Sequence, residues 1–330
     1  MTVASLRSAP PLPAPCGILS ESVSRALSSG DTGALPTSVH TPDPMSRDLH
    51  LALTMCYELH YRGFEGVDDE VEWDPDVLRL RRMLETAFMD YLRDNIETGG
   101  DVVAEMDALS IEPATGTGPS WFLQDNGTWD QMREYFTHRS IYHLKEADPH
   151  AWAIPRLQGQ AKASFVAVEF DEYGGGRGER VHQQLWADLM DSAGLDSSYL
   201  GYVDQVPAQS LASVNLMSLF GLHRGSRGAT VGHFAATEIT SSPGSRRFVA
   251  ALQRLGAPEP CVAFYREHVE ADAVHEQILR HDVVGDLVRR EPDLEADVVF
   301  GMRAFDLIEG ALGDHILSAW NADESSLLSN

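Results

Sequence analysis

The sequence predicts an all-α protein, and two observations carry this prediction. Apolar side chains recur with the spacing of an α-helix in almost every segment after Asp43, and no segment alternates apolar and polar residues over the length of a strand. Clusters of glycine, serine and proline, which form turns, separate these segments at 174–176, 225–228 and 241–244. We therefore expect helices over 46–61, 75–96, 129–137, 151–173, 178–193, 197–205, 208–223, 229–240, 245–255, 260–281 and 294–320.

The first elements follow from local composition. Residues 1–40 are rich in proline, serine, alanine and glycine, so we expect a mostly disordered N-terminal arm. The segment 46–61 carries a broad apolar stripe, which predicts a helix with one buried face. The next helix should begin at Asp74-Pro75, an N-cap followed by proline at the first helical position. The remaining helices follow the same periodicity and stop at the turn clusters.

Composition limits the function. The chain has 330 residues and a formal net charge of −25, which argues against nucleic acid and against anionic membrane surfaces. Its three cysteines form no CxxC pair, which excludes a zinc knuckle and suits a reducing compartment. No apolar stretch predicts a signal peptide or a membrane span. We therefore expect a cytoplasmic protein whose acidic surface favours cations.

The clearest local signal is His268-x3-Asp272-x2-His275. Offsets of four and seven residues place the three side chains within an arc of about 60° on one helix face. Imidazole and carboxylate together are typical ligands of transition metals, iron among them. A solvated polar face is the alternative, but apolar residues such as Val269 and Val274 interleave with this set, so the face should lie close to the core.

A second signal surrounds the glycine run. On one unbroken helix Glu172 and His182 would lie about 15 Å apart and out of phase, but the intervening glycines break the helix and allow the two residues to fold together. In a competing interpretation, Glu179 and His182 form an ExxH motif and Asp272-x2-His275 is its aspartate version, as in ferritin-like di-iron bundles. The residues alone leave open whether Glu172 or Glu179 is the ligand.

Two further acids complete a candidate set. Glu146 precedes a helix stop at Asp148-Pro149, and Glu238 lies among apolar neighbours. A carboxylate buried in such surroundings needs a partner, which a metal ion supplies. The pattern therefore predicts a dimetal carboxylate site in an all-α protein.

These residues, in their order and spacing, resemble the ligand pattern of the haem-oxygenase-like dimetal oxidases, also called iron-containing redox enzymes. The resemblance covers roughly residues 115–320 and selects Glu172 over Glu179. It implies a seven-helix haem-oxygenase-like bundle over 115–330, preceded by auxiliary helices over 41–114 and the arm over 1–40. The implied metal ligands are Glu146, Glu172, His182, Glu238, His268, Asp272 and His275.

The resemblance also implies the chemistry. It points to an O2-dependent non-haem di-iron oxidase with two iron ions, O2 as co-substrate and a small amino acid or amine as substrate, acting in natural-product biosynthesis by N-oxygenation, desaturation or C–C cleavage. Glu172 would span both irons, and Tyr265, three residues before His268, is a further candidate catalytic residue that shares the ligand face. Tyr142 shares a ligand face in the same way, and core packing is the alternative role for both tyrosines. A homodimer and an external electron donor are compatible with this family.

Three other functions remain open. A thiaminase-like hydrolase on the same fold would be metal-independent and would need a nucleophilic cysteine, for which Cys261 is the candidate. A haem oxygenase would use one proximal histidine and no carboxylate cluster. A non-enzymatic iron-binding protein would use the same ligands without turnover.

Overall fold

The computed structural model describes residues 9–39, 43–112 and 115–329. Within these ranges the chain forms helices and turns and contains no strand, so the all-α prediction is confirmed. No helix in the described ranges has the length and apolar character needed to cross a membrane.

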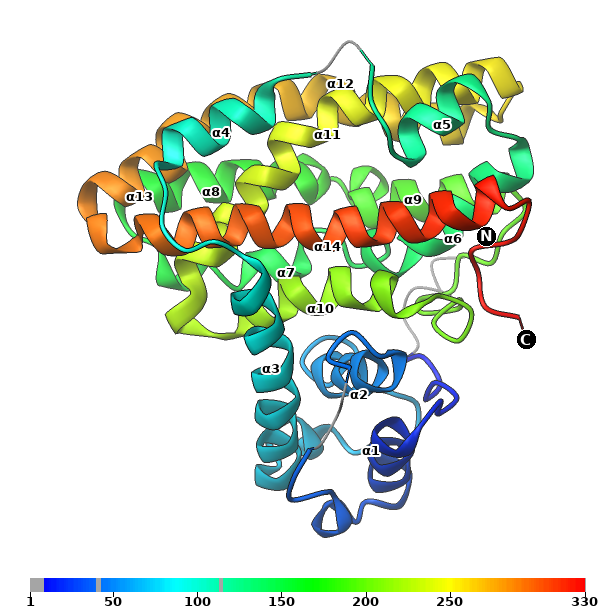
Figure 1. Cartoon of the computed structure of the whole chain (residues 1–330), viewed down its shortest axis with the longest axis vertical. Helices are drawn as coiled ribbons and strands as arrows, with labels where there is room; N and C mark the ends of the chain where they lie inside the picture. The colour runs from blue at the N-terminus through cyan, green and yellow to red at the C-terminus, as the bar shows by residue number, and fades with distance from the viewer. Residues whose placement is uncertain (1–8, 40–42, 113–114, 330) are drawn as a thin grey trace.

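The bundle is built around α11 (Arg227–Leu255), which packs along α14 (Glu295–Asn321) and α12 (Glu259–Gln277). Figure 1 shows α14 crossing the front of the bundle with α11 behind it. The other helices of the bundle are α5 (Pro119–Asp125), α6 (Trp129–His143), α7 (Asp148–Ala151), α8 (Gly159–Glu172), α9 (His182–Ser192), α10 (Ala208–Leu222) and α13 (Gly285–Arg290). Short 3-10 turns join them at η3 (Ile154–Arg156), η4 (Gly174–Gly176), η5 (Gly178–Arg180), η6 (Arg224–Ser226) and η8 (Pro292–Leu294).

The N-terminal helices form a lobe beside α10, seen below the bundle in Figure 1. They are α1 (Ile18–Ser29), α2 (Arg47–Glu58) and α3 (Pro75–Asn95), with the 3-10 turns η1 (Thr32–Ala34) and η2 (Asp69–Trp73). Asp74 caps α3 by accepting hydrogen bonds from the backbone of the first turn, as its sequence predicts. The next helix, α4 (Val102–Ser110), packs on α11 and α14 and therefore lies against the bundle.

The expectation of a disordered arm over 1–40 is wrong for α1. This helix buries Val23, Ala26 and Leu27 against α2, at the i, i+3, i+4 spacing of an apolar face. The carboxylate of Asp48 in α2 accepts hydrogen bonds from the backbone N–H groups of Leu19 and Ser20, so it caps the helix from outside. The cap comes from a distant residue, which composition alone does not reveal. Residues 1–8 of the arm lie outside the described part.

Three other predictions of local structure are wrong. The helix expected over 151–173 is broken, because α7 ends at Ala151 and α8 begins only at Gly159. The turn expected at 241–244 is absent, because α11 continues through Pro243 as one helix packed on α12 and α14. The segment 197–205 forms turns instead of a helix. In addition, α12 runs directly into a π-helical segment, η7 (Ile278–Val284), before α13.

Candidate metal centre

The fold brings six of the seven predicted ligands to the centre of the bundle from five places. Glu146 follows the end of α6, Glu172 ends α8, His182 begins α9 and Glu238 lies in α11. The two histidines His268 and His275 lie on α12. Each of the six residues is at most 6% exposed, so none is a surface charge. The seventh, Asp272, belongs to α12 by its backbone, but its side chain lies outside the described part of the structure.

The six side chains fall into two groups that share one carboxylate. Glu146, Glu172, His182 and His268 form the first group, and Glu172, Glu238 and His275 form the second. Within each group every residue offers one nitrogen or oxygen atom, and these atoms lie within 4.8 Å of one another.

The two oxygens of Glu172 face different groups. Its Oε2 lies 2.7 Å from Nδ1 of His182, whereas its Oε1 lies 3.7 Å from Nδ1 of His275. The same nitrogen of His275 lies 3.1 Å from Oε2 of Glu238. In the first group, Nε2 of His268 lies 3.7 Å from Oε1 of Glu146. Glu172 therefore has the geometry of a carboxylate that spans two neighbouring positions.

The glycine run brings Glu172 and His182 together. Gly174, Gly175 and Gly176 all have φ between +61° and +81°, a region that other residues rarely adopt. A Cβ on Gly174 would lie 2.6 Å from the backbone of Arg180 and Val181, so the chain turns back on itself too tightly for a side chain there. Glu179 follows this turn, is exposed and belongs to neither group of candidate ligands. In the ExxH interpretation it would be a metal ligand.

Contacts between histidines and glutamates in the first group shift the pKa values of these residues. Burial alone would raise the pKa of Glu146, but the neighbouring imidazoles of His143 and His268 hold it well below its usual range. Burial likewise opposes ionisation of Glu172, and the imidazole of His182 holds its pKa below the usual value. In return, Glu172 raises the pKa of His182 against the effect of burial. Positive charge at this centre therefore keeps its acids ionised.

The donor atoms fit bound metal ions. Oε2 of Glu146 is buried and has no hydrogen-bond partner among the described residues. Nδ1 of His182 is also buried, and although it lies close to Glu172 the two groups are not aligned for a hydrogen bond. Buried polar atoms in proteins normally have partners, so two such atoms without a hydrogen bond in one group of candidate ligands fit a bound ion. Imidazole nitrogens with carboxylate oxygens suit Fe(II).

Three neighbours of the centre were not singled out by the sequence as functional. Nδ1 of His143 lies 2.9 Å from Oε1 of Glu146, and Nε2 of His275 lies 3.2 Å from the exposed carboxylate of Asp171. Glu169, one turn before Glu172, is 2% exposed, and neither of its oxygens has a hydrogen-bond partner among the described residues. Burial, with the nearby acids Glu172 and Glu238, raises its pKa well above the usual value. The i, i+3 spacing of Glu169 and Glu172 is the signal that could have identified it.

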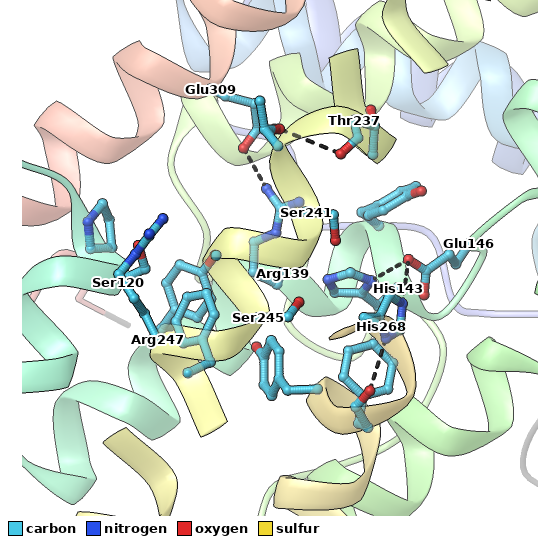
Figure 2. Close-up of a pocket in the computed structure, with 18 of the residues that line it drawn as sticks. Ser120, Arg139, His143, Glu146, Thr237, Ser241, Ser245, Arg247, His268 and Glu309 are labelled. Atoms are coloured by element: carbon cyan, nitrogen blue, oxygen red, sulfur yellow. Dashed lines mark hydrogen bonds and ion pairs between the residues drawn. The ribbon is translucent and has the colours of Figure 1, made fainter. Parts of the chain in front are cut away.

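A chamber of about 250 Å³ opens beside the first group. Glu146, His143 and His268 line its inner end, and Figure 2 shows these three residues on one side of the view with Arg247 and Ser120 on the other. The full lining also includes Pro119, Tyr135, Arg139, Tyr142, Thr237, Thr240, Ser241, Gly244, Ser245, Phe248, Phe264, Tyr265, Phe305 and Glu309. Tyr142 and Tyr265, the two tyrosines predicted from their helix faces, both belong to this lining.

The N-terminal lobe contacts the segment just before Glu146. The ammonium of Lys145 donates to Oε2 of Glu58 at 2.6 Å, and the hydroxyl of Tyr199 donates to the other oxygen of Glu58 at 2.7 Å. All three residues are buried. Arg62 donates to the carbonyl of Leu144, so two side chains from the lobe hold the turn just before the ligand.

Comparison with known proteins agrees with this geometry. The family model described as iron-containing redox enzyme matches residues 133–310, which include all seven candidate ligands. Nitrosourea synthase from Streptomyces achromogenes subsp. streptozoticus is 25% identical over 235 residues, which cover 69% of this chain and 50% of that enzyme. The chain thus spans about half the length of this curated relative. Its helical bundle is of the haem-oxygenase-like type, and the chain belongs to the family of iron-containing redox enzymes.

Proposed function

We propose that the protein is an O2-dependent non-haem di-iron oxidase or oxygenase that acts on a small amino acid or amine. The observation that carries the proposal is the pair of buried histidine–carboxylate groups that share Glu172. A pair of metal ions requires two adjacent groups of ligands with a common carboxylate. A site for a single metal ion would need only one such group.

In this proposal, one iron is held by Glu146, Glu172, His182 and His268, and the other by Glu172, Glu238 and His275. Asp272 remains a predicted ligand, and we assign it to the second iron because it lies one turn before His275 on the same helix. The four carboxylates then balance the four positive charges of two Fe(II) ions. Without metal these acids would crowd one another, which costs free energy.

Iron bound at these positions supplies the O2-activating chemistry, and the protein controls what reaches it. The ligands lie in a buried centre, which limits access of water. The chamber meets the first group at Glu146 and His268, so a substrate in the chamber would lie beside that iron. Glu172 would fix the relative position of the two irons through its two oxygens.

The relative favours nitrogen chemistry among the possible reactions. A nitrosourea contains a nitrogen–nitrogen bond with oxygen on the outer nitrogen, so an enzyme named for its synthesis handles nitrogen atoms. This supports N-oxygenation in natural-product biosynthesis for the present chain, ahead of desaturation or C–C cleavage.

The hydrolase alternative is disfavoured by the state of Cys261. Its thiol is buried, and burial raises its pKa, whereas a nucleophilic cysteine needs an accessible thiolate. Its Sγ lies 3.3 Å from the Ser192 hydroxyl, and the residue does not line the chamber.

Iron analysis combined with O2 uptake tests the proposal. Anaerobic loading with Fe(II) should give two irons per chain, and a panel of amino acids and amines should contain a compound that stimulates O2 consumption. Absence of metal binding would refute the proposal and favour the hydrolase. A Soret band with added haem would favour a haem oxygenase, and iron uptake without any turnover would favour an iron-binding protein. A cytoplasmic location, a homodimer and an external electron donor belong to the same proposal.

A further inference from the structure

Ala147, which follows the ligand Glu146, has a backbone conformation that an alanine side chain disfavours. Its φ is +73° and its ψ is −41°, a region in which alanine is strained and glycine is not. The residue is fully buried and lies between Glu146 and Asp148, the first residue of α7. Relaxation to a negative φ would rotate Glu146 relative to α7. The turn therefore keeps this conformation only if contacts on both sides of Ala147 hold it.

The side of the turn that carries Glu146 is held by an amide from α9. Gln183 is the residue after the ligand His182, and its Nε2 donates to the backbone carbonyl of Glu146 at 3.0 Å. Arg62 of the N-terminal lobe fixes this amide, because it donates to Oε1 of Gln183 and to the carbonyl of Leu144, both at 3.1 Å. Two half-buried side chains thus connect the backbone at one ligand to the helix that carries another.

The other side of the turn is held from the end of α8. Tyr173 is the residue after the ligand Glu172, and its hydroxyl donates to Oδ1 of Asp148 at 3.0 Å. The contacts of Tyr173 and Gln183 therefore lie on opposite sides of Ala147. They come from the two segments that supply the other carboxylate and one imidazole of the first group. The positions of three ligands thus depend on one small network of hydrogen bonds.

We propose that Gln183 is a positioning residue for the first iron, which the first group of ligands holds. Together with Arg62 it keeps the strained turn at Ala147 in the conformation that presents Glu146 to the metal. This inference rests on the proposed function and deepens it, because it concerns how one of the two irons is bound. Gln183 and Arg62 do not line the chamber, so they act on a ligand and not on the substrate.

Anaerobic Fe(II) titration of a matched pair of variants tests the proposal. Gln183→Met keeps the approximate size of the side chain but removes its hydrogen bonds. One of the two irons should then bind about tenfold more weakly, as is typical when a group that orients a metal ligand is lost. Gln184→Met is the control, because the amide of Gln184 donates to Asp188 on the surface. Wild-type affinity for both irons in Gln183→Met, or an equal loss in the two variants, would refute the proposal.

A second substitution separates positioning from general packing. Glycine adopts a positive φ without strain, so Ala147→Gly should restore most of the iron affinity that Gln183→Met loses. A residue that only packed the fold would show no such recovery, and its absence would overturn the role of the turn. Arg62→Lys keeps the cation over the ring of Tyr199 but loses the planar donor set, so it should weaken the same iron several-fold.

The identity of the affected iron is tested in the His275→Ala variant, which should retain only the first iron. Addition of Gln183→Met to this variant should weaken the remaining iron by the same factor as in the wild-type background. Unchanged binding there would overturn the assignment to the first iron.

Hydrogen exchange of the iron-free protein gives a measurement that needs no metal. Residues 144–150 should exchange faster in Gln183→Met than in Gln184→Met, and equal exchange would show that Gln183 does not hold the turn. The titration separates this proposal from the proposed function. Two irons in the wild type with unchanged affinity in Gln183→Met would reject the positioning role alone, whereas failure of the wild type to bind iron would reject the di-iron centre.

Discussion

Replacement of Glu169 by glutamine should change how the stability of the iron-free protein depends on pH. The Glu169 carboxyl is buried, has no hydrogen-bond partner in the described structure, and has a pKa raised well above its usual value, first by burial and then by nearby acids. It therefore keeps its proton in the folded state at pH values where the unfolded chain has released it.

The sign and size of the effect follow from proton linkage. Above about pH 4.5 the unfolded state binds fewer protons at this group than the folded state, so the free energy of unfolding falls as pH rises. The loss is about 1.4 kcal/mol per pH unit until the pH reaches the raised pKa of the folded protein. Glutamine has the same shape and does not titrate, so the variant should be progressively more stable than the wild type as pH rises from 4.5.

Urea unfolding of iron-free protein at intervals between pH 4.5 and 8 measures this difference. Glu179→Gln is the matched control, because Glu179 is an exposed glutamate ten residues further along the chain and should leave the wild-type curve unchanged. If the curves of Glu169→Gln and wild type stay parallel across this range, Glu169 is ionised in the folded protein and the argument fails. Since Glu169 belongs to neither ligand group, its variant should still bind two irons.

The other predictions concern the metal centre. His275→Ala should lower the iron content from two per chain to about one and abolish oxidation while the circular dichroism of the helices is retained; a variant with two irons and full activity would contradict the assignment. Glu172→Ala should lose iron and Glu179→Ala should not, as measured by metal analysis, and the reverse result would favour the ferritin-like arrangement. Fe(II) at a hundred times its dissociation constant should stabilise the fold by about 2.7 kcal/mol, seen as a higher melting temperature. It should also protect residues 260–281 from hydrogen exchange, and equal protection with and without Fe(II) would mean that the site is preformed or lies elsewhere.

The sequence predicted the parts of the site that depend on local spacing. His268 and His275 share a helix face because both lie on one uninterrupted helix, and this follows from periodicity alone. The approach of Glu172 to His182 was foreseeable because a run of glycines breaks the helix between them and lets the chain turn back. The choice between Glu172 and Glu179, however, needed the resemblance to a family, since both glutamates are near the same histidine in the sequence.

Features that depend on distant contacts were not predictable. Helix α1 is capped by Asp48 and α11 continues through Pro243 because of packing that a helical pattern does not encode. No arginine could be assigned to the chamber from the sequence. Arg139 lies there together with Glu309, which is 170 positions away along the chain. Periodicity shows which face of a helix is buried, but it does not show which residues that face contacts.

The buried ion pair between Glu58 and Lys145 links the N-terminal lobe to the metal centre. Lys145 is the immediate neighbour of Glu146, and its ammonium is paired with Glu58 of the N-terminal lobe at 2.6 Å. In a shortened chain without α2, this cation would lose its partner and would be free to pair with the neighbouring carboxylate, in competition with iron. Removal of the lobe should therefore weaken iron binding even if every ligand is kept.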